Sequence, residues 1–206
     1  MEKKYVLTDE TIKYAGTTLH RIKALRDFSN VKAGDLGGFI ESEENLSQLD
    51  YAWVYGDAKV HGNAKVYGNA WVSDNAEVSD NAWVHGDARV SDNAWVYGDA
   101  EVSDNAKVHG NAKVHSDAKV HGDAEVYGNA WVYGDADYLC FKGLGSENRY
   151  TTFFKCRDRH IHVNCGCFSG NIDDFEAKVR ETHGDNKYAK EYLACVQVVK
   201  IHFEIE

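Results

Sequence analysis

A six-residue repeat dominates the middle of this chain. Valine recurs at every sixth position from Val54 to Val132, fourteen times, and an alanine stands two positions before each of these valines. Because alternate residues of an extended strand point to the same side, alanine and valine share one face and the residues flanking the valine point the other way. The last two positions of each unit are Gly, Asp, Asn or Ser, which tolerate a tightly turned backbone. Each repeat is therefore predicted to be a short strand followed by a corner.

Strands this short cannot bury an apolar face alone, so successive repeats must stack on one another. Alanine and valine would fill a narrow interior in which larger side chains do not fit. A parallel β-solenoid is the architecture that this strict period favours, and no helical reading accounts for it. The regular part covers residues 53–136.

The Ala-x-Val hexads resemble those of the hexapeptide-repeat acyltransferase superfamily. This resemblance implies a left-handed parallel β-helix in which three hexads form one triangular coil, giving about four to five coils between residues 53 and 137. It also implies assembly as a homotrimer. The expected fold class is therefore an all-β solenoid with additional elements at both ends.

A narrower resemblance covers the segments around the repeat. Residues 19–28, 34–41 and 45–47, together with residues 165–170 near the end, are similar to segments of a group of phage-borne and enteric-bacterial proteins labelled putative transferases. The likeness implies a phage-related lineage. It does not imply a reaction, because one fold hosts many functions.

Residues 1–52 do not follow the period and are predicted to form an N-terminal β cap with the first irregular coils. The bulky residues Phe28, Leu36, Phe39 and Ile40 suit a lid over the open end of the solenoid, whose terminal strands would otherwise be unpaired edges.

Residues 137–206 are predicted to form a C-terminal α+β module. Strands are expected over residues 138–141, 150–157 and 160–166, with a tight turn at 157–159. Two helices follow, the first with Asn171 as its N-cap, and the alternation of apolar and polar residues from Ile201 to Ile205 predicts a final strand.

Composition limits the function. The net charge is −10, and residues 53–137 carry 14 acidic and 6 basic residues, so the shaft is the acidic part. Direct nucleic-acid binding along it is not expected, because phosphates require a basic surface; mimicry of nucleic acid stays open as an alternative. No apolar run long enough to span a membrane occurs. An odd number of cysteines, five, indicates a reduced, cytoplasmic setting rather than a disulfide framework.

The repeat region lacks the features of an acyltransferase site. Its hexads are uninterrupted, and its five histidines all follow a valine, at a tolerant outward position where no base-orienting partner is evident. No catalytic residue and no cofactor are predicted. The hypothesis favoured here is a non-catalytic, oligomeric binding protein that engages a host protein or sequesters a small anionic, nucleotide-like ligand. A CoA-dependent acyltransferase is the alternative.

Two groups of residues are candidates for binding. Side chains that could hold an anion are Arg21, Lys23, Arg26, Arg157, Arg159 and His160. Aromatic side chains predicted to point outward and to form an oligomer interface are Trp53, Trp71, Trp83, Trp95, Tyr97, Trp131 and Tyr133. Stacking at eighteen-residue spacing places Trp53 over Trp71.

Two further clusters are weaker candidates for a metal. His160, His162, Cys165 and Cys167 are ligand types that suit zinc, but in one strand the histidines and the cysteines would project to opposite faces, and buried structural cysteines are the alternative. Asp99, Asp117 and Asp135 should stack at one corner, where ordinary corner residues are favoured over an ion site.

Overall fold

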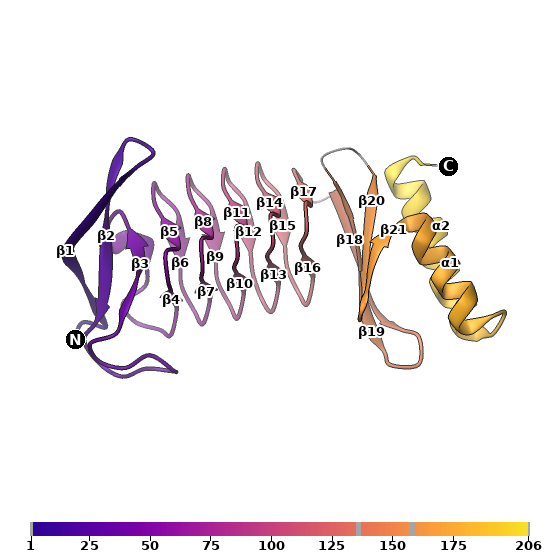
Figure 1. Ribbon diagram of the computed structural model, residues 1–206, viewed down its shortest axis with the longest axis horizontal. Helices are drawn as coiled ribbons and strands as arrows, with labels where there is room; N and C mark the ends of the chain where they lie inside the picture. The colour runs from indigo at the N-terminus through magenta and orange to yellow at the C-terminus, as the bar shows by residue number, and fades with distance from the viewer. Residues whose placement is uncertain (1, 135–136, 157–159, 206) are drawn as a thin grey trace.

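Figure 1 shows an elongated molecule with a β hairpin at one end, a regular shaft in the middle, and a β-sheet with two helices at the other end. This computed structural model describes residues 2–134, 137–156 and 160–205. The shaft is a parallel β-solenoid of about five turns, as the repeat predicts.

Each hexad contributes one two-residue strand to the shaft. In the described chain these strands, β4 to β17, are Trp53–Val54, Lys59–Val60, Lys65–Val66, Trp71–Val72, Glu77–Val78, Trp83–Val84, Arg89–Val90, Trp95–Val96, Glu101–Val102, Lys107–Val108, Lys113–Val114, Lys119–Val120, Glu125–Val126 and Trp131–Val132.

Three parallel faces arise because every third strand pairs. One face runs β5-β8-β11-β14-β17, the second β4-β7-β10-β13-β16 and the third β6-β9-β12-β15. Paired residues are eighteen apart, as in Trp53↔Trp71 and Val96↔Val114. The backbone N–H of Trp95 accordingly donates to the carbonyl of Ala112, one coil further on, at 2.9 Å. The prediction of three hexads per coil and of Trp53 over Trp71 is confirmed.

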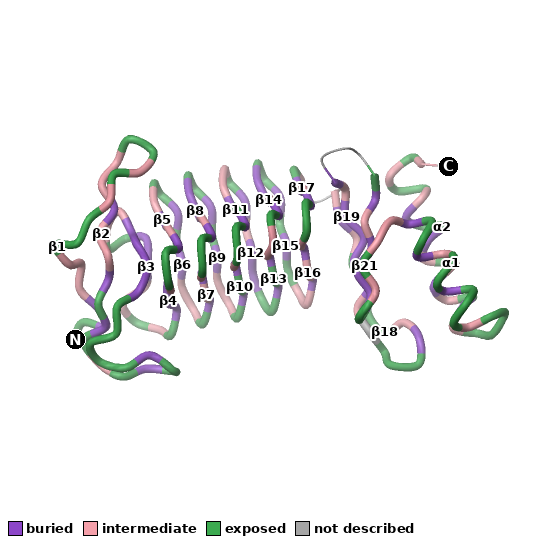
Figure 2. Tube along the Cα trace, in the orientation of Figure 1, coloured by how far each residue is buried: buried purple, intermediate pink, exposed green. Residues whose placement is uncertain are grey.

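The interior of the shaft holds the alanines and valines. Each described alanine and valine of the repeat, from Ala52 to Val132, exposes at most 1% of its surface, and Figure 2 shows this buried lining alternating with exposed residues around the coils. Burying each valine contributes about 2 kcal/mol. Stacking of coils thus supplies the core that one hexad lacks.

The corners explain the last two positions of the hexad. The fifth residue has a positive φ in each repeat from Gly56 to Gly128, glycine alternating with Asp74, Asp80 and other short polar residues. These aspartates reach the next coil: Asp92 Oδ2 accepts the N–H of Gly110 at 2.9 Å. The sixth residue forms side-chain ladders, such as Asn81 Nδ2 donating to Asp99 Oδ1 at 2.9 Å. The third member of the predicted aspartate column, Asp135, lies outside the described residues.

The N-terminal cap extends one face of the shaft. Strands β1 (Tyr5–Tyr14) and β2 (Thr17–Ala24) form an antiparallel hairpin, and β3 (Leu36–Ile40) pairs with β2 on one side and in parallel with β5 on the other. A single 3-10 turn, η1 (Glu43–Asn45), precedes the first coil. On this face the first strand of the shaft, β5, is therefore paired rather than exposed.

The lid differs in two details from the sequence prediction. Phe28, Phe39 and Ile40 are buried as expected, but Leu36 is 57% exposed, because it is the first residue of β3 and points away from the core. Trp53 occupies the predicted outward position yet is only 1% exposed, since Phe28 covers it with ring centroids 5.3 Å apart. Its assignment to an exposed surface is wrong.

A buried lysine ties the cap to the first coil. Lys4 is fully buried, and its Nζ donates to the carbonyls of Asp50 at 3.1 Å and Ala52 at 2.8 Å. Burial lowers its pKa to about 8, although the Asp50 carboxylate partly offsets this.

This lysine makes stability pH-dependent in a defined direction. Between the folded pKa of about 8 and the unfolded value of 10.5, the unfolded chain binds more protons than the folded one, so stability rises with pH. We expect urea titrations to show the unfolding free energy increasing by about 2 kcal/mol from pH 8 to about pH 10. The variant Lys4→Met, which keeps all other titrating groups, should lack this rise; an identical slope in both proteins would contradict the assignment.

The C-terminal module is a four-stranded antiparallel sheet backed by two helices. The strands are β18 (Tyr138–Leu144), β19 (Arg149–Lys155), β20 (Ile161–Cys165) and β21 (Phe168–Asn171), paired in chain order. Helices α1 (Ile172–His183) and α2 (Lys187–Phe203) follow, and Asn171 caps α1 by accepting the N–H of Asp174 at 2.8 Å, as predicted.

One prediction for this module is wrong, one strand was not predicted, and one predicted turn lies outside the described residues. The expected final strand does not form, because α2 continues through Ile201 and ends only when Glu204 adopts a left-handed backbone. Strand β21 was not expected. The predicted turn at 157–159 lies outside the described residues.

Alternate residues of this sheet point to two separate hydrophobic cores, one on each side of the sheet. Phe153 and Val163 face the helices, whereas Phe154 and Cys156 belong to the same apolar cluster as the shaft interior. Asn164, also on the shaft side, donates to the carbonyl of Glu125 at 3.5 Å. The module therefore covers the far end of the solenoid with one sheet face.

Candidate functional site

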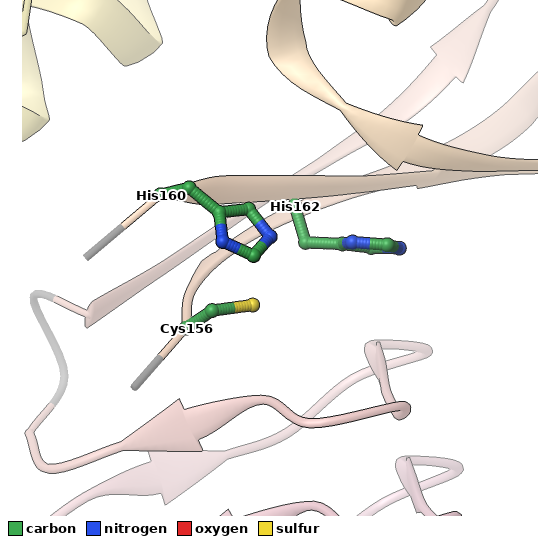
Figure 3. Close-up of side chains that lie close together, drawn as sticks. All are labelled: Cys156, His160 and His162. Atoms are coloured by element: carbon green, nitrogen blue, oxygen red, sulfur yellow. The ribbon is translucent and has the colours of Figure 1, made fainter. Parts of the chain in front are cut away.

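Three possible metal ligands meet on the sheet face that covers the shaft. Cys156 follows β19, His160 directly precedes β20, and His162 is its second residue; the N–H of Cys156 donates to the carbonyl of His160 at 2.9 Å. Phe154 pairs with His162 across the two strands, so Cys156 and His162 project to the same side. Figure 3 shows the Cys156 sulfur and the two imidazole rings gathered together. Their ligand atoms all lie within 4.8 Å of one another.

His162 is held firmly within this cluster. Its Nε2 lies 2.8 Å from Ser169 Oγ on the neighbouring strand β21, and its ring stacks on Phe154 with centroids 5.2 Å apart. Tyr127 of the last coil contacts it edge-on at 6.3 Å. Burial, and secondarily the nearby His160, lower the pKa of His162. The ring is thus neutral at physiological pH and oriented, the state in which an imidazole binds a metal.

A pocket opens beside the cluster, between the sheet and the last two coils. Its volume is about 600 Å³, and its lining comprises Asn111, Lys113, Asn129, Ala130, Trp131, Cys156 and His160. Pockets of this size hold small molecules. Its wall combines one ammonium group, amides, an indole face and the metal-ligand types of the cluster.

Lys113 is positioned by two tryptophans. Its Nζ lies 4.2 Å from the ring centroid of Trp95 and 5.7 Å from that of Trp131, one coil to either side on the same face. Such cation–π contacts hold an ammonium group in place while leaving its charge available. The eighteen-residue stacking of the hexads produces this arrangement.

The candidate metal residues of the sequence analysis are only partly brought together. His160 and His162 lie in the cluster, but Cys165 is buried on the opposite sheet face, where it accepts from Thr151 Oγ1 at 3.1 Å and donates to the Tyr192 hydroxyl at 3.7 Å. Cys167 is exposed beyond the end of β20. Opposite parity separates these cysteines from the histidines, and Cys156 is the residue that sequence reasoning missed.

The predicted anion-binding residues do not form one site. Arg21 is occupied near the N-terminus, with its Nε 2.7 Å from Glu10 and its guanidinium over the Phe39 ring. Lys23 is exposed and Arg26 half-buried in the same cap, at the opposite end of the molecule from strand β20 (Figure 1), which His160 directly precedes. Arg157 and Arg159 lie outside the described residues.

The shaft histidines are not the unpartnered surface residues that the sequence suggested. Three of them contact a glutamate sixteen positions later: His61 with Glu77 at 3.0 Å, His85 with Glu101 at 2.7 Å, and His109 with Glu125 at 3.2 Å. Rings also stack between coils, as in Tyr67 on His85 at 4.7 Å. The three pairs lie on the three different faces of the prism. Each face therefore has one histidine–glutamate contact that links neighbouring coils. The regular spacing of histidine and glutamate was the signal for them.

The predicted outward aromatics vary in exposure. Trp83, Trp95 and Tyr133 are 46%, 40% and 47% exposed, whereas Trp71, Tyr97 and Trp131 are half-buried. On the β11-β14-β17 face the rings of four of these residues form a continuous set around the buried His115, whose ring stacks on Tyr97 with centroids 4.8 Å apart; the four are Trp95, Tyr97, Trp131 and Tyr133. This surface borders the pocket through Trp131.

Compared with known proteins, the chain matches no protein-family model and no curated protein. The resemblance to hexapeptide-repeat proteins is therefore supported at the level of the fold, a parallel β-solenoid of hexads. Neither described helix has the length and apolar character needed to cross a membrane.

Proposed function

We propose that this chain is a non-catalytic binding protein that holds a small, planar anionic ligand of the nucleotide type in the pocket between the last coils and the C-terminal sheet. The observation that carries the proposal is Lys113, whose ammonium group is fixed between Trp95 and Trp131 on the pocket wall. A lysine attracts phosphate as a point charge, an indole stacks on a planar base, and the amides of Asn111 and Asn129 offer donors and acceptors for its edge.

The setting we propose follows the lineage suggested by the repeat and its flanks. The chain belongs with the left-handed hexapeptide-repeat proteins, is phage-related, and acts in the host cytoplasm as a homotrimer whose subunits meet through exposed rings such as Trp83 and Trp95. In that setting, ligand capture would withdraw a signalling nucleotide from a host protein. The adjoining rings on the β11-β14-β17 face support the trimer, because contiguous exposed rings are typical of association surfaces.

Calorimetric titration of purified protein with a panel of nucleotides and acyl-CoA tests the proposal. We expect a nucleotide to bind, and Lys113→Gln to weaken it by about 10-fold or more, since a hydrogen bond to a charged group contributes about 1.5–3 kcal/mol. Lys65→Gln alters the same hexad position in β6, away from the pocket, and should leave the affinity unchanged.

Three outcomes would contradict the proposal. These are the absence of binding across the panel, equal affinity of the Lys113→Gln variant, and acyl transfer upon addition of acyl-CoA. The last would favour the acyltransferase alternative. Sedimentation equilibrium on the same sample should give the mass of a trimer, and a monomer would remove the oligomeric part.

A further inference from the structure

We propose that Cys156, His160 and His162 form a zinc site with three protein ligands, whose fourth coordination position opens to the pocket beside Lys113. This inference goes beyond the proposed function and rests on different side chains: Cys156 and His160 share the pocket wall with Lys113, but Lys113 and the tryptophans that hold it are not ligands.

The geometry of the three residues suits a tetrahedral ion. Zinc binds thiolate at about 2.3 Å and imidazole at about 2.0–2.1 Å, so ligand atoms in a tetrahedron lie roughly 3.5 Å apart. The three ligand atoms here are all within 4.8 Å of one another. Side-chain rotations that move each ligand atom by about 1 Å would bring them to the tetrahedral separation. The backbone hydrogen bond from the N–H of Cys156 to the carbonyl of His160, 2.9 Å long, fixes the relative position of the two chain segments that carry these ligands.

Contacts around His162 support the same reading. When its Nε2 carries the proton and donates to Ser169 Oγ, 2.8 Å away, the Nδ1 lone pair is left for a metal. Metal-binding histidines characteristically donate their other ring N–H to an oxygen in this way. Stacking on Phe154 further restricts the ring.

The ligand types select zinc over the common hard cations. One thiolate and two imidazoles suit zinc, whereas calcium and magnesium require oxygen ligands. Three protein ligands leave one position open, as in zinc sites that bind water or a further ligand. Cys156 and His160 line the pocket, so a ligand entering it can reach that position. A zinc ion with one thiolate carries a net charge of +1, which adds to the charge of Lys113.

Metal analysis of tag-free, full-length protein provides the first test. After chelation and dialysis against zinc, we expect one zinc ion per chain. Substituted cobalt should show the thiolate-to-cobalt charge-transfer band that only a cysteine ligand gives. Cys156→Ser and His162→Ala should each weaken binding by about 100-fold or more, since even contacts beyond the ligands alter affinity by about 10–100-fold. Cys167→Ser, which alters an exposed cysteine outside the cluster, should bind as the parent does.

A second measurement on the unaltered protein covers the case in which a variant fails to fold. Cys156 is a buried thiol, so its alkylation is compared by peptide mass spectrometry over hours in zinc-loaded and chelated protein: zinc should slow it below its rate in the chelated protein, while the exposed Cys140 and Cys167 react equally in both. No zinc binding, a cobalt spectrum without the thiolate band, or an unprotected Cys156 would overturn the proposal. Lys113→Gln should retain its zinc, so failure of the nucleotide proposal is read separately.

Discussion

Replacing Val96 by aspartate is expected to unfold the protein. Val96 is fully buried between the coils, where the substitution removes about 2 kcal/mol of apolar burial and places a carboxylate that has no cationic partner in the alanine–valine interior. The desolvation of that charge costs several kcal/mol more. We expect a loss of about 5 kcal/mol or more, which reaches the lower end of the roughly 5–15 kcal/mol that stabilises a typical domain.

The neighbouring residue supplies the matched control. Trp95 stands one position earlier in the same strand and is 40% exposed on the opposite side, so Trp95→Asp, which loses the contacts with Lys113 and Tyr97, should cost about 2 kcal/mol at most. Urea unfolding followed by circular dichroism compares the two variants. Equal losses, or a larger loss for Trp95→Asp, would show that the valines do not face the interior.

The substitution Gly38→Ala is expected to have the next largest effect. A Cβ at Gly38 would lie 2.6 Å from the carbonyl oxygen of Ala58 and 2.7 Å from Val54 Cγ1, both in the first coils. Because the obstacle includes backbone, β3 would have to move away from its partner β5. We expect a loss of about 3 kcal/mol, at the upper end for overpacked sites, and early unfolding of the cap.

Gly134→Ala is the appropriate comparison for this glycine. Within the part of the chain that the structure describes, its added Cβ would meet only Asp117 Oδ1, at 3.6 Å, which is an ordinary contact, so stability should change by less than about 0.5 kcal/mol. Amide hydrogen exchange would show which strands lose stability in the Gly38→Ala variant, and we expect these to be the cap strands β1 to β3. Protection that stays unchanged in β1 to β3 would contradict the role assigned to the close approach at Gly38.

The shaft could be predicted from the sequence because its contacts repeat. Once three hexads form a coil, the neighbour of Trp95 must be Lys113 and the next must be Trp131, as observed. Burial of each alanine and valine follows from the same alternation. The left-handed backbone conformation of the corner residues can also be predicted from the repeat, because residues such as Gly, Asp and Asn tolerate a positive φ.

Contacts between irregular segments could not be predicted in this way. Trp53 has the same hexad position as Trp95, yet Phe28 covers one and solvent reaches the other. Lys4 is a charged residue near a chain end, which the sequence alone indicates to be exposed, and only the fold of the cap brings it to the carbonyls of Asp50 and Ala52. The six-residue repeat does not specify these contacts between the cap and the first coil.

The metal cluster illustrates the same limit. Sequence spacing could be examined only along one strand, where His160 and His162 are followed by Cys165 on the wrong face. The third ligand, Cys156, belongs to the neighbouring antiparallel segment. Its register with β20 depends on how β19 and β20 pair. The prediction of a final strand was wrong for a related reason: the alternation from Ile201 to Ile205 is too short to outweigh the helical spacing of Tyr192, Val196 and Val199, all buried in α2.

Scalar couplings across hydrogen bonds, measured by NMR on isotopically labelled protein, test the eighteen-residue coil most directly. The amide of Trp95 should couple to the carbonyl of Ala112, and that of Trp53 to the carbonyl of Ala70, since these N–H groups donate to those oxygens at 2.9 and 3.1 Å. Couplings that instead join residues at any other regular spacing would contradict the three-sided coil, and with it the position of Lys113 beside the pocket.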